Sequence, residues 1–441
     1  MINFDQLNLN KPLLNALEDM EYFYPTPIQE QAFSMIMAGK NVTGLAQTGT
    51  GKTLAYLLPL LRQLKYSEQK HPRVLIMVPT RELVNQVLGE ITKLTKYMHV
   101  RVAGVYGGSN MSSQKEAVYK GLDILVATPG RLMDLNLNGV LRLKFIQHLV
   151  IDEVDEMLSL GFRTQLTTLM GLMPERRQNL LFSATLSPDV EKLIHDYILN
   201  PHKIEVEPQG TPVEKIKQEG VYLPNFYTKV NMLLHLLNDE KLSKILVFVK
   251  NKRVADELYA QVVTKHTGLA GVIHSNKSQP QRFKAIDRFE KGTNRVLIAT
   301  DIIARGLDLA GVSHVINFDL PDTAGDYVHR IGRTGRAEAQ GTAISFVSDE
   351  EKEYLTAIEA YIRKEIPVAN PPKELKISEQ LTEDEKPVLR GKNPLKGSAI
   401  KDSGGAFHEK KDKNKKVNLG GPGKRYAKQG SVRSAKKKRK Y

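Results

Sequence analysis

The chain has 441 residues, 41% of them hydrophobic, and a formal net charge of +15 at pH 7. This size suits two globular domains with an additional segment, and the apolar content excludes a chain that is disordered throughout. The lack of cysteine excludes disulfides and cysteine-ligated zinc. The start, MINFDQLNLN, does not resemble a signal peptide, and no run approaches the roughly 18 apolar residues of a membrane span, so we expect a soluble, cytoplasmic protein.

Short apolar runs alternate with amphipathic, helix-like segments. Six runs lie in the first half: NVTGLA (41–46), RVLIMVP (73–79), VRVAGVY (100–106), DILVATP (123–129), HLVIDE (148–153) and NLLFSA (179–184). Five lie in the second half: KILVFVK (244–250), LAGVIH (269–274), RVLIAT (295–300), HVINFD (314–319) and TAISFV (342–347). Strands that are apolar on both faces and separated by helices are typical of parallel sheets. The sequence predicts an α/β protein with two doubly wound parallel-sheet domains in tandem.

A polar, proline-bearing stretch separates the two series of runs. It predicts a first domain over residues 1–206, a linker over 207–215 and a second domain over 216–370. The remainder, 371–441, reads as a disordered tail that is first polar and then basic.

The basic part of this tail holds most of the charge of the chain. Residues 391–441 contain 17 Lys and Arg against 3 Asp and Glu, a net +14, which leaves +1 for residues 1–390. Such a tail either binds a polyanion or only keeps the chain in solution. Its terminal KKKRK also mimics a nuclear address.

The stretch AQTGTGKT follows one predicted strand and precedes a helical segment, which is the setting of a P-loop. Glycines let backbone N–H groups approach phosphate oxygens, the lysine reaches the β- and γ-phosphates, and the last threonine offers its hydroxyl to Mg²⁺. Its first residue is alanine where the general pattern has glycine. We therefore expect ATP and Mg²⁺ to bind here, at Ala46, Gln47, Thr48, Gly49, Thr50, Gly51, Lys52 and Thr53.

The stretch LVIDEVDEM (149–157) runs from an apolar strand into four carboxylates. Alone, these acids suit the solvated first turn of a helix. Beside a P-loop they have a cation to bind: Asp152 is placed to hold Mg²⁺ through water, and Glu153 to orient or deprotonate the attacking water.

The stretch HRIGRTGR (329–336) supplies positive charge in the second half of the chain. Arg333 and Arg336 are three residues apart, so both can face one side of a turn. They are candidates for arginine fingers that stabilise the γ-phosphoryl group when the domains close. The alternative is an ordinary basic helix end.

These motifs together resemble the DEAD-box family of ATP-dependent RNA helicases, over roughly residues 4–350. The matching stretches are YPTPIQ (24–29), AQTGTGKT, PTREL (79–83), GG (107–108), TPGR (128–131), DEVD (152–155), SAT (183–185), QPQR (279–282), ATDIIARGLDL (299–309) and HRIGRTGR. The overall pattern is similar to the bacterial RhlE-like group. The resemblance implies an RNA-dependent ATPase that unwinds short duplexes locally, or remodels RNA–protein complexes, as two domains close.

The resemblance also implies roles for single residues. Gln29 would read adenine beside the ring of Phe4 or Tyr22, and Asp308 would contact the ribose. Ser183 and Thr185 would couple hydrolysis to strand separation, and Asp155 would pair with His329. The RNA backbone would lie along Pro79, Thr80, Arg81, Gly108, Thr128, Gly130, Arg131, Arg282 and Thr300.

The chain departs from the family pattern at two positions. Val154 stands where alanine is usual, which puts in question its packing against SAT. Glu21 stands where glycine is common.

Two other functions are compatible with the same motifs. One is an ATP-gated RNA clamp or assembly scaffold with little productive unwinding. The other, a DNA translocase, is disfavoured by Gln29 and the DEVD and SAT stretches. We expect a monomer with RNA as partner, bound largely through its backbone, and with the basic tail as tether. The sequence leaves open whether there are ribonucleoprotein partners and which RNA is bound. It also leaves open the pathway, whether ribosome assembly, mRNA turnover or cold adaptation.

Overall fold

The computed structural model describes residues 2–46, 49–206, 216–301, 309, 311–335 and 341–386. Met1–Lys386 forms one compact unit. The predicted linker, 207–215, and residues 387–441 of the predicted tail lie outside the described residues. Within the described ranges, no helix is long and apolar enough to cross a membrane.

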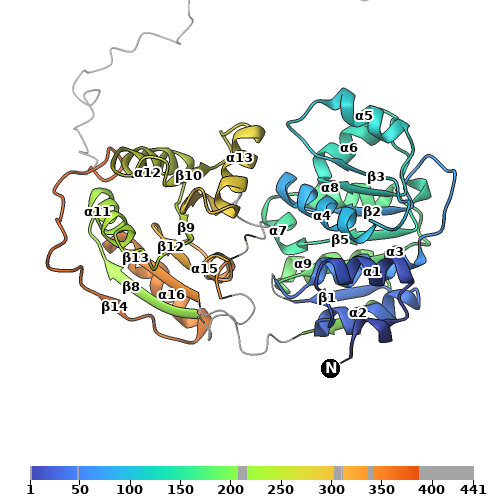
Figure 1. Ribbon diagram of the computed structural model, residues 1–441, viewed down its shortest axis with the longest axis horizontal. Helices are drawn as coiled ribbons and strands as arrows, with labels where there is room; N and C mark the ends of the chain where they lie inside the picture. Colours follow the sequence, from blue (N-terminus) through green and yellow to red (C-terminus); the bar gives the residue numbers. More distant parts are fainter. Residues whose placement is uncertain are drawn as a thin grey trace, which may run out of the picture. The chain divides into compact units, whose positions relative to one another are not determined.

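The strands of residues 2–206 form one parallel sheet in the order β3-β4-β2-β5-β6-β1-β7 (Figure 1). β1 lies between β6 and β7, so that Val42 is opposite both Leu180 and His202. The strands are β1 Val42–Leu45, β2 Val74–Met77, β3 Val102–Val105, β4 Ile124–Ala127, β5 His148–Ile151, β6 Gln178–Ser183 and β7 His202–Glu205.

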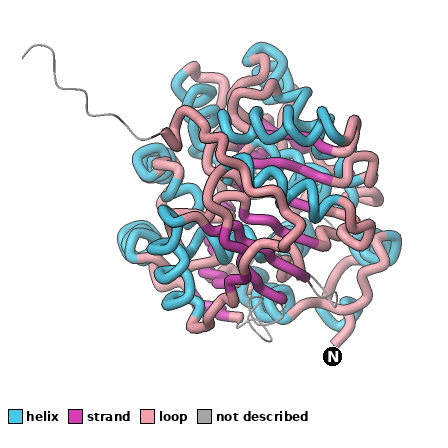
Figure 2. The backbone as a smooth tube through the Cα atoms, turned by 90° about the vertical axis from the view of Figure 1, so that its left-hand side faces the viewer, coloured by secondary structure: helices cyan, strands magenta, loops and turns pink. Residues whose placement is uncertain are grey.

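Helices cover both faces of this sheet. Figure 2, which draws strands in magenta and helices in cyan, shows strands with helices on either side of them. Val74 and Ile76 of β2 pack into one apolar cluster, and Leu75 and Met77 into the other. Because successive side chains of a strand point to opposite faces, the two clusters mean that both faces are buried. The helices are η1 Phe4–Leu7, α1 Lys11–Asp19, α2 Pro27–Met37, α3 Lys52–Gln63, α4 Arg81–Leu94, α5 Met111–Tyr119, α6 Pro129–Leu137, η2 Leu143–Phe145, α7 Val154–Ser159, α8 Arg163–Gly171 and α9 Pro188–Tyr197.

The strands of residues 216–386 form a second parallel sheet in the order β10-β11-β9-β12-β13-β8-β14 (Figure 1). Its strands are β8 Ile216–Tyr222, β9 Ile245–Phe248, β10 Ala270–Ile273, β11 Val296–Ala299, β12 His314–Asn317, β13 Gly341–Val347 and β14 Val368–Ala369. Its helices are α11 Phe226–Leu237, α12 Lys252–Lys265, α13 Gln279–Glu290, α15 Ala324–Ile331, η3 Asp349–Glu351 and α16 Lys352–Ile362.

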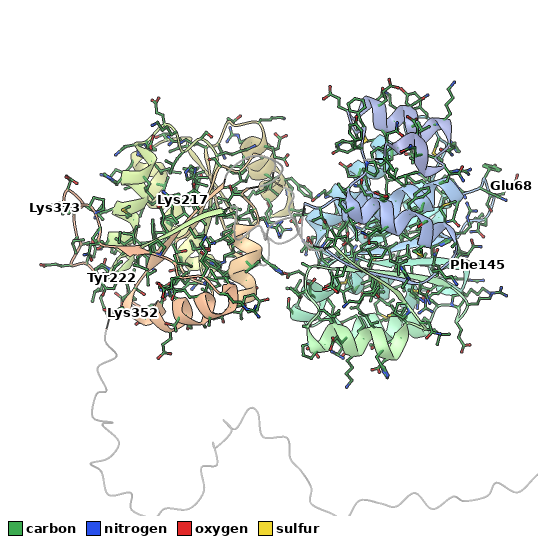
Figure 3. All side chains as sticks on the ribbon, turned by 90° about the horizontal axis from the view of Figure 1, so that it is seen from below. Glu68, Phe145, Lys217, Tyr222, Lys352 and Lys373 are labelled. Atoms are coloured by element: carbon green, nitrogen blue, oxygen red, sulfur yellow. The ribbon has the colours of Figure 1, made fainter. Side chains whose placement is uncertain are left out.

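Side chains join the end of β8 to η3 and to the first residue of α16 (Figure 3). The Tyr222 hydroxyl donates to Asp349 over 2.7 Å, and the Lys352 ammonium lies 5.1 Å from the centre of the Tyr222 ring.

Each strand proposed from an apolar run occurs in the structure, so the two-sheet fold predicted from the sequence is confirmed.

Residues 371–386, which the sequence assigns to the tail, lie against α11. The Asn231 amide donates to the Lys376 carbonyl over 2.7 Å, and the Asn225 amide donates to the Ser378 carbonyl over 2.6 Å. The Glu385 carboxylate accepts the N–H of Phe226 at the first turn of α11 over 2.6 Å, where an anion is favourable. These side-chain bonds order a segment whose composition is polar.

Candidate functional site

The order of strands in the first sheet divides the predicted motifs into two groups. Parallel strands end at the same edge of a sheet, where ligands of doubly wound domains bind. The neighbouring strands β5, β6 and β1 end at DEVD, SAT and the P-loop. The neighbouring strands β3, β4 and β2 end at GG, TPGR and PTREL. The first group predicts a nucleotide site, and the second a separate site beside it.

A cavity of about 440 Å³ lies at the end of β1 and β5. It is lined by residues of the adenine-reading segment, the P-loop, DEVD and HRIGRTGR, together with their neighbours: Phe4, Tyr22, Tyr24, Thr26, Gln29, Gly49, Gly51, Lys52, Thr53, Leu54, Leu83, Gln86, Glu90, Asp152, Glu153 and Arg333. Ala46 is buried at the end of β1. Gln47, Thr48, Asp308 and Arg336 lie outside the described residues.

The P-loop leads directly into α3. Gly51 has φ +90°, in the left-handed region that glycine adopts without strain, and it precedes Lys52, the first residue of the helix. The first N–H groups of a helix lack partners within the helix, and the helix dipole makes this end attractive to phosphate. The backbone therefore forms an anion site at the mouth of α3.

Two charged groups in this cavity are buried without a hydrogen-bond partner among the described residues: the Lys52 ammonium and one oxygen of Glu153. Lys52 is 6% exposed and Glu153 7%. Buried charges without partners are costly, so such groups indicate a ligand that supplies the partners. A triphosphate would neutralise the lysine.

Glu153 is held in an unusual backbone conformation. Its φ is 53° and ψ 53°, which an L residue adopts only with strain, and strain of this kind gathers at functional sites. Burial raises the pKa of Glu153 to about 7, although Lys52 opposes the shift. A carboxylate with such a pKa is suited to accept a proton near neutral pH.

Asp152 and Thr53 supply oxygen ligands of the kind that Mg²⁺ prefers. Burial raises the pKa of Asp152, whereas Lys52 and a hydrogen bond from Tyr56 lower it. No group of three or more His, Cys, Asp or Glu able to hold a metal occurs in the part of the chain that the structure describes. Mg²⁺ in phosphate-binding sites uses one or two protein ligands and completes its shell with phosphates and water. The residues present therefore fit Mg²⁺ bound together with a nucleotide.

Asp155 joins the DEVD stretch to the SAT stretch. One of its oxygens accepts the N–H of Ala184 over 3.2 Å and both the N–H and the hydroxyl of Thr185 over 2.9 Å. The Ser183 hydroxyl donates to the Thr185 carbonyl over 2.8 Å. The SAT stretch is therefore hydrogen-bonded directly to the acidic stretch that follows β5.

His329 contacts Glu156 rather than Asp155, the partner that the resemblance implies. Its Nδ1 lies 2.8 Å from Oε1 of Glu156. Burial lowers the pKa of His329, but the hydrogen bond and charge of Glu156 outweigh that effect, so the net shift is upward. Asp155 is already occupied by three donors from SAT, which explains the difference.

The two departures from the family pattern have structural explanations. Val154 is fully buried in an apolar cluster, and the bonds between Asp155 and SAT are made beside it, so the extra methyl groups are accommodated. Glu21 has φ 57° just after α1, and Tyr22 N–H bonds back to Leu17. This is the helix ending in which glycine is usual, so Glu21 takes a glycine-like conformation.

The aromatic side of the cavity has three rings. Phe4 is 4% exposed and packs in the core, whereas Tyr22 is 46% and Tyr24 62% exposed. Tyr24 was not among the predicted site residues, although it belongs to YPTPIQ. Glu156 was missed too, because spacing alone does not distinguish it from the other acids of the stretch.

The residues predicted to line RNA in the first domain lie at the starts of α4 and α6 and in the loop before α5. Thr80 caps α4 by accepting the N–H of Leu83 over 3.2 Å, Thr128 precedes α6, and Gly130 is in the first turn of α6. Pro79 lies in the short connection between β2 and α4. Unpaired N–H groups at helix starts bind phosphates without reading bases.

Two arginines of this group are held by neighbouring loops. A Cβ at Gly108, which has φ +76°, would clash with the Arg81 guanidinium, so the glycine makes room for that side chain. Arg131 donates to Gln114 over 2.7 Å and to the Ser109 carbonyl over 3.2 Å. Arg131 therefore braces the loop after GG.

In the second domain, Arg282 lies in the first turn of α13 and Thr300 follows β11 directly. Arg282 forms an ion pair with Glu82 of PTREL, and Arg81 donates to Gln279 over 3.3 Å. The structure thus brings PTREL and QPQR together.

Comparisons with known proteins agree with this geometry. Residues 26–193 match the DEAD/DEAH box helicase model, and residues 228–338 match the helicase conserved C-terminal domain model. The chain is 39% identical over 375 residues to the ATP-dependent RNA helicase RhlB of Shewanella piezotolerans, covering 83% of this chain and 85% of that protein. The RhlB of Shewanella sp. strain MR-4 is 38% identical over the same shares.

Solved structures of two similar proteins contain RNA and a nucleotide analogue. Dbp5 of S. cerevisiae bound to RNA and ADP BeF3 has 30% identity and a TM-score of 0.76, over 83% of this chain and 95% of that chain. Mss116p bound to ssRNA and AMP-PNP has 26% identity and a TM-score of 0.77, over 86% and 83%.

Proposed function

Because this chain belongs to the DEAD-box family of ATP-dependent RNA helicases, we propose that it is itself an RNA-dependent ATPase that unwinds short RNA duplexes locally or remodels RNA–protein complexes. The observation that carries the proposal is the burial of Lys52 and Glu153, whose ammonium and one carboxylate oxygen have no hydrogen-bond partner within the described part of the chain. A triphosphate and an attacking water supply what these two groups lack.

The nucleotide occupies the cavity with its base at the aromatic side. Gln29 lies beside Gly51 and can present an amide to the adenine edge, where a donor and an acceptor are both needed. Phe4, Tyr22 and Tyr24 supply ring faces for the base. Asp308 is assigned to the ribose from the family pattern alone.

The phosphate end carries the chemistry. Lys52 and the P-loop backbone bind the β- and γ-phosphates, and Thr53 and Asp152 would hold Mg²⁺. When bound, Mg²⁺ would neutralise charge on the phosphate oxygens. Glu153 orients the attacking water and accepts its proton, and Arg333 and Arg336 stabilise the charge that develops on the γ-phosphoryl oxygens.

RNA lies along the helix starts that follow β2, β3 and β4 and continues to Arg282 and Thr300. These residues offer N–H groups, hydroxyls and guanidinium groups to phosphate and sugar, so binding is largely independent of base sequence. ATP and RNA each favour the closed arrangement of the two domains, and each therefore tightens the binding of the other. Hydrolysis at the acids is coupled to release of the RNA strand by the hydrogen bonds between Asp155 and SAT.

The experiment that tests this function compares two substitutions. Glu153→Gln keeps size and hydrogen bonding while removing the base, so it should bind ATP, lose turnover and hold RNA for longer. Lys52→Ala should weaken nucleotide binding itself. The measurements are RNA-stimulated ATPase and equilibrium nucleotide affinity; near-normal ATPase in Glu153→Gln would refute the assignment.

The second candidate function, an ATP-gated RNA clamp, is favoured by the ion pair between Arg282 and Glu82, which joins the RNA-lining segments of the two domains. Strand displacement with ATP and with a nonhydrolysable analogue separates the two. Repeated turnover on duplexes supports the helicase, and tight binding without release supports the clamp.

The location and partners of the protein are proposed from its relatives. Its bacterial relatives are named RNA helicases, which favours a cytoplasmic protein with RNA, and ribonucleoprotein complexes, as partners. We assign it as a monomer with the basic tail as an RNA tether. Membership of the RhlE-like group stays a prediction.

A further inference from the structure

Tyr56 is a buried tyrosine one helical turn beyond Lys52. It lies in α3, four residues after Lys52 and three after Thr53, so the three side chains share one side of the helix. Its residue exposure is 0%, and its ring packs on Phe182 of β6 with 5.3 Å between ring centres. The helical segment around it is otherwise apolar, LLPLL directly following. Its hydroxyl is therefore a polar group placed at the border of the core and the nucleotide cavity.

That hydroxyl bonds to the acid at the end of β5. The Tyr56 oxygen lies 3.0 Å from Oδ2 of Asp152, within a buried pair. A phenol keeps its proton at neutral pH, and burial raises the pKa of Tyr56 further, with the charge of Asp152 as the next cause. Tyr56 is thus the donor and Asp152 the acceptor.

The other oxygen of Asp152 is also held. Oδ1 accepts the N–H of Glu153 over 3.0 Å, so each carboxylate oxygen has one donor from the protein. The phenol of Tyr56 therefore holds Asp152, one of the two residues that the proposed function assigns to Mg²⁺.

We infer that Tyr56 is a positioning residue for the metal end of the ATP site: its hydroxyl fixes the orientation of the Asp152 carboxylate toward Mg²⁺. The inference rests on the proposed metal role of Asp152. Groups that orient metal ligands typically change metal affinity by roughly 10- to 100-fold when removed. A tyrosine whose hydroxyl is merely satisfied in the core would not change metal dependence at all.

The test uses the full chain with Tyr56→Phe, which removes one oxygen and keeps the ring on Phe182. Tyr327→Phe is the matched control, because Tyr327 is equally buried and its hydroxyl donates to Gln218 over 2.9 Å. The affinity for a fluorescent ADP is measured in EDTA and over a series of Mg²⁺ concentrations. Tyr56→Phe should bind ADP in EDTA as the wild type does, but need about tenfold or more Mg²⁺ for half of the tightening. Tyr327→Phe should match the wild type in both.

The outcomes separate the inference from the function on which it rests. If the wild type tightens with Mg²⁺ and Tyr56→Phe does so at the same concentration, the positioning role is wrong and the metal site stands. If the wild type shows no Mg²⁺ dependence, the metal assignment fails and the inference with it. Tyr56→Met, which also lacks the hydroxyl but fills the space with a flexible apolar chain, gives a second reading if the phenylalanine variant does not fold.

Discussion

The amide nitrogen of Gln29 donates to the carbonyl of Gly51 over 3.1 Å, and its amide oxygen accepts the N–H of Thr26 over 3.0 Å. One side chain thus connects the start of α2, which carries the predicted adenine-reading motif, to the P-loop. A Cβ at Gly51 would clash with that amide. The base end and the phosphate end of the site are therefore fixed relative to each other by Gln29.

Gly51→Ala should damage both ends of the site. The backbone at Gly51 has φ +90°, where a side chain adds roughly 1–2 kcal/mol of strain, and the new methyl group would displace Gln29. We expect a lower unfolding midpoint and weaker ATP binding, measured by denaturant titration and nucleotide titration.

The matched control is Gly89→Ala in the middle of α4, where a Cβ meets open space. Alanine is about 1 kcal/mol better than glycine in a helix interior, so this variant should be more stable and bind ATP normally. Equal behaviour of the two variants would contradict the strain argument.

Asp123 is the centre of a buried ionic network that is independent of the nucleotide site. Arg101 donates from Nε and Nη2 over 3.0 Å to its two oxygens, and Arg73 donates over 3.0 Å. Asp123→Asn leaves two arginines without their anion, so we expect a loss of about 3 kcal/mol in the free energy of unfolding. Asp19→Asn, which breaks an exposed pair with Lys96, should change little.

The same network predicts how the difference depends on pH. Burial acts to raise the pKa of Asp123, but the bonds from Arg101 and Arg73 outweigh it and hold the pKa below the ordinary value of 3.8. A carboxyl with a lowered folded pKa stabilises the protein above its unfolded pKa and loses that contribution as the pH falls through the folded pKa. The stability difference between wild type and Asp123→Asn should therefore be full at neutral pH and shrink below about pH 3.8. A constant difference down to pH 2 would contradict the network.

The fold and most of the candidate site could be predicted because their signals are local. Most of the buried strands are runs that are apolar on both faces; Asp152 and Glu153 follow such a run directly, and the P-loop with Lys52 follows another. In a parallel sheet the polar residues after each strand meet at one edge, so a correct set of strands places the motifs together.

The features that could not be predicted depend on neighbours distant in sequence. β7 has one buried residue in four and β14 none, so neither forms an apolar run, and both are recognised only by pairing with β1 and β8. Residues 371–386 are polar and gain order from side chains of α11. Tyr56 reads as an apolar core position until its oxygen is seen beside Asp152.

Arg333→Ala should reduce hydrolysis far more than ATP affinity. Arginine fingers contribute roughly 10³- to 10⁵-fold to turnover, or about 4–7 kcal/mol of barrier. Arg333 lines the nucleotide cavity, and its Nε donates to the His329 carbonyl over 3.3 Å. The measurement is RNA-stimulated ATPase over a range of ATP; a collapse of ATP affinity with normal turnover at saturation means that Arg333 only binds nucleotide.

Arg330→Ala is the contrasting variant. Arg330 makes two bonds to Asp301, over 2.6 and 2.7 Å, and contacts the ring of Phe248 within the second domain. Its loss should lower the unfolding midpoint, whereas Arg333→Ala should leave that midpoint nearly unchanged. Similar destabilisation by both variants would indicate that Arg333 acts on the fold.

Residues 391–441 should act as a nonspecific RNA tether that raises capture of substrate without entering the chemistry. This segment holds a net +14 of the total +15 and none of the ATPase motifs. If it neutralised about five phosphates on single strands, log affinity would fall with log salt at a slope near −3.5, roughly a hundredfold loss from 50 to 200 mM salt. Deleting 391–441 should raise the RNA concentration for half-maximal ATPase and flatten its salt dependence, with the rate at saturating RNA nearly unchanged. Identical salt slopes for full-length and truncated protein refute the tether, and a lost saturated rate means that the segment supports the catalytic domains.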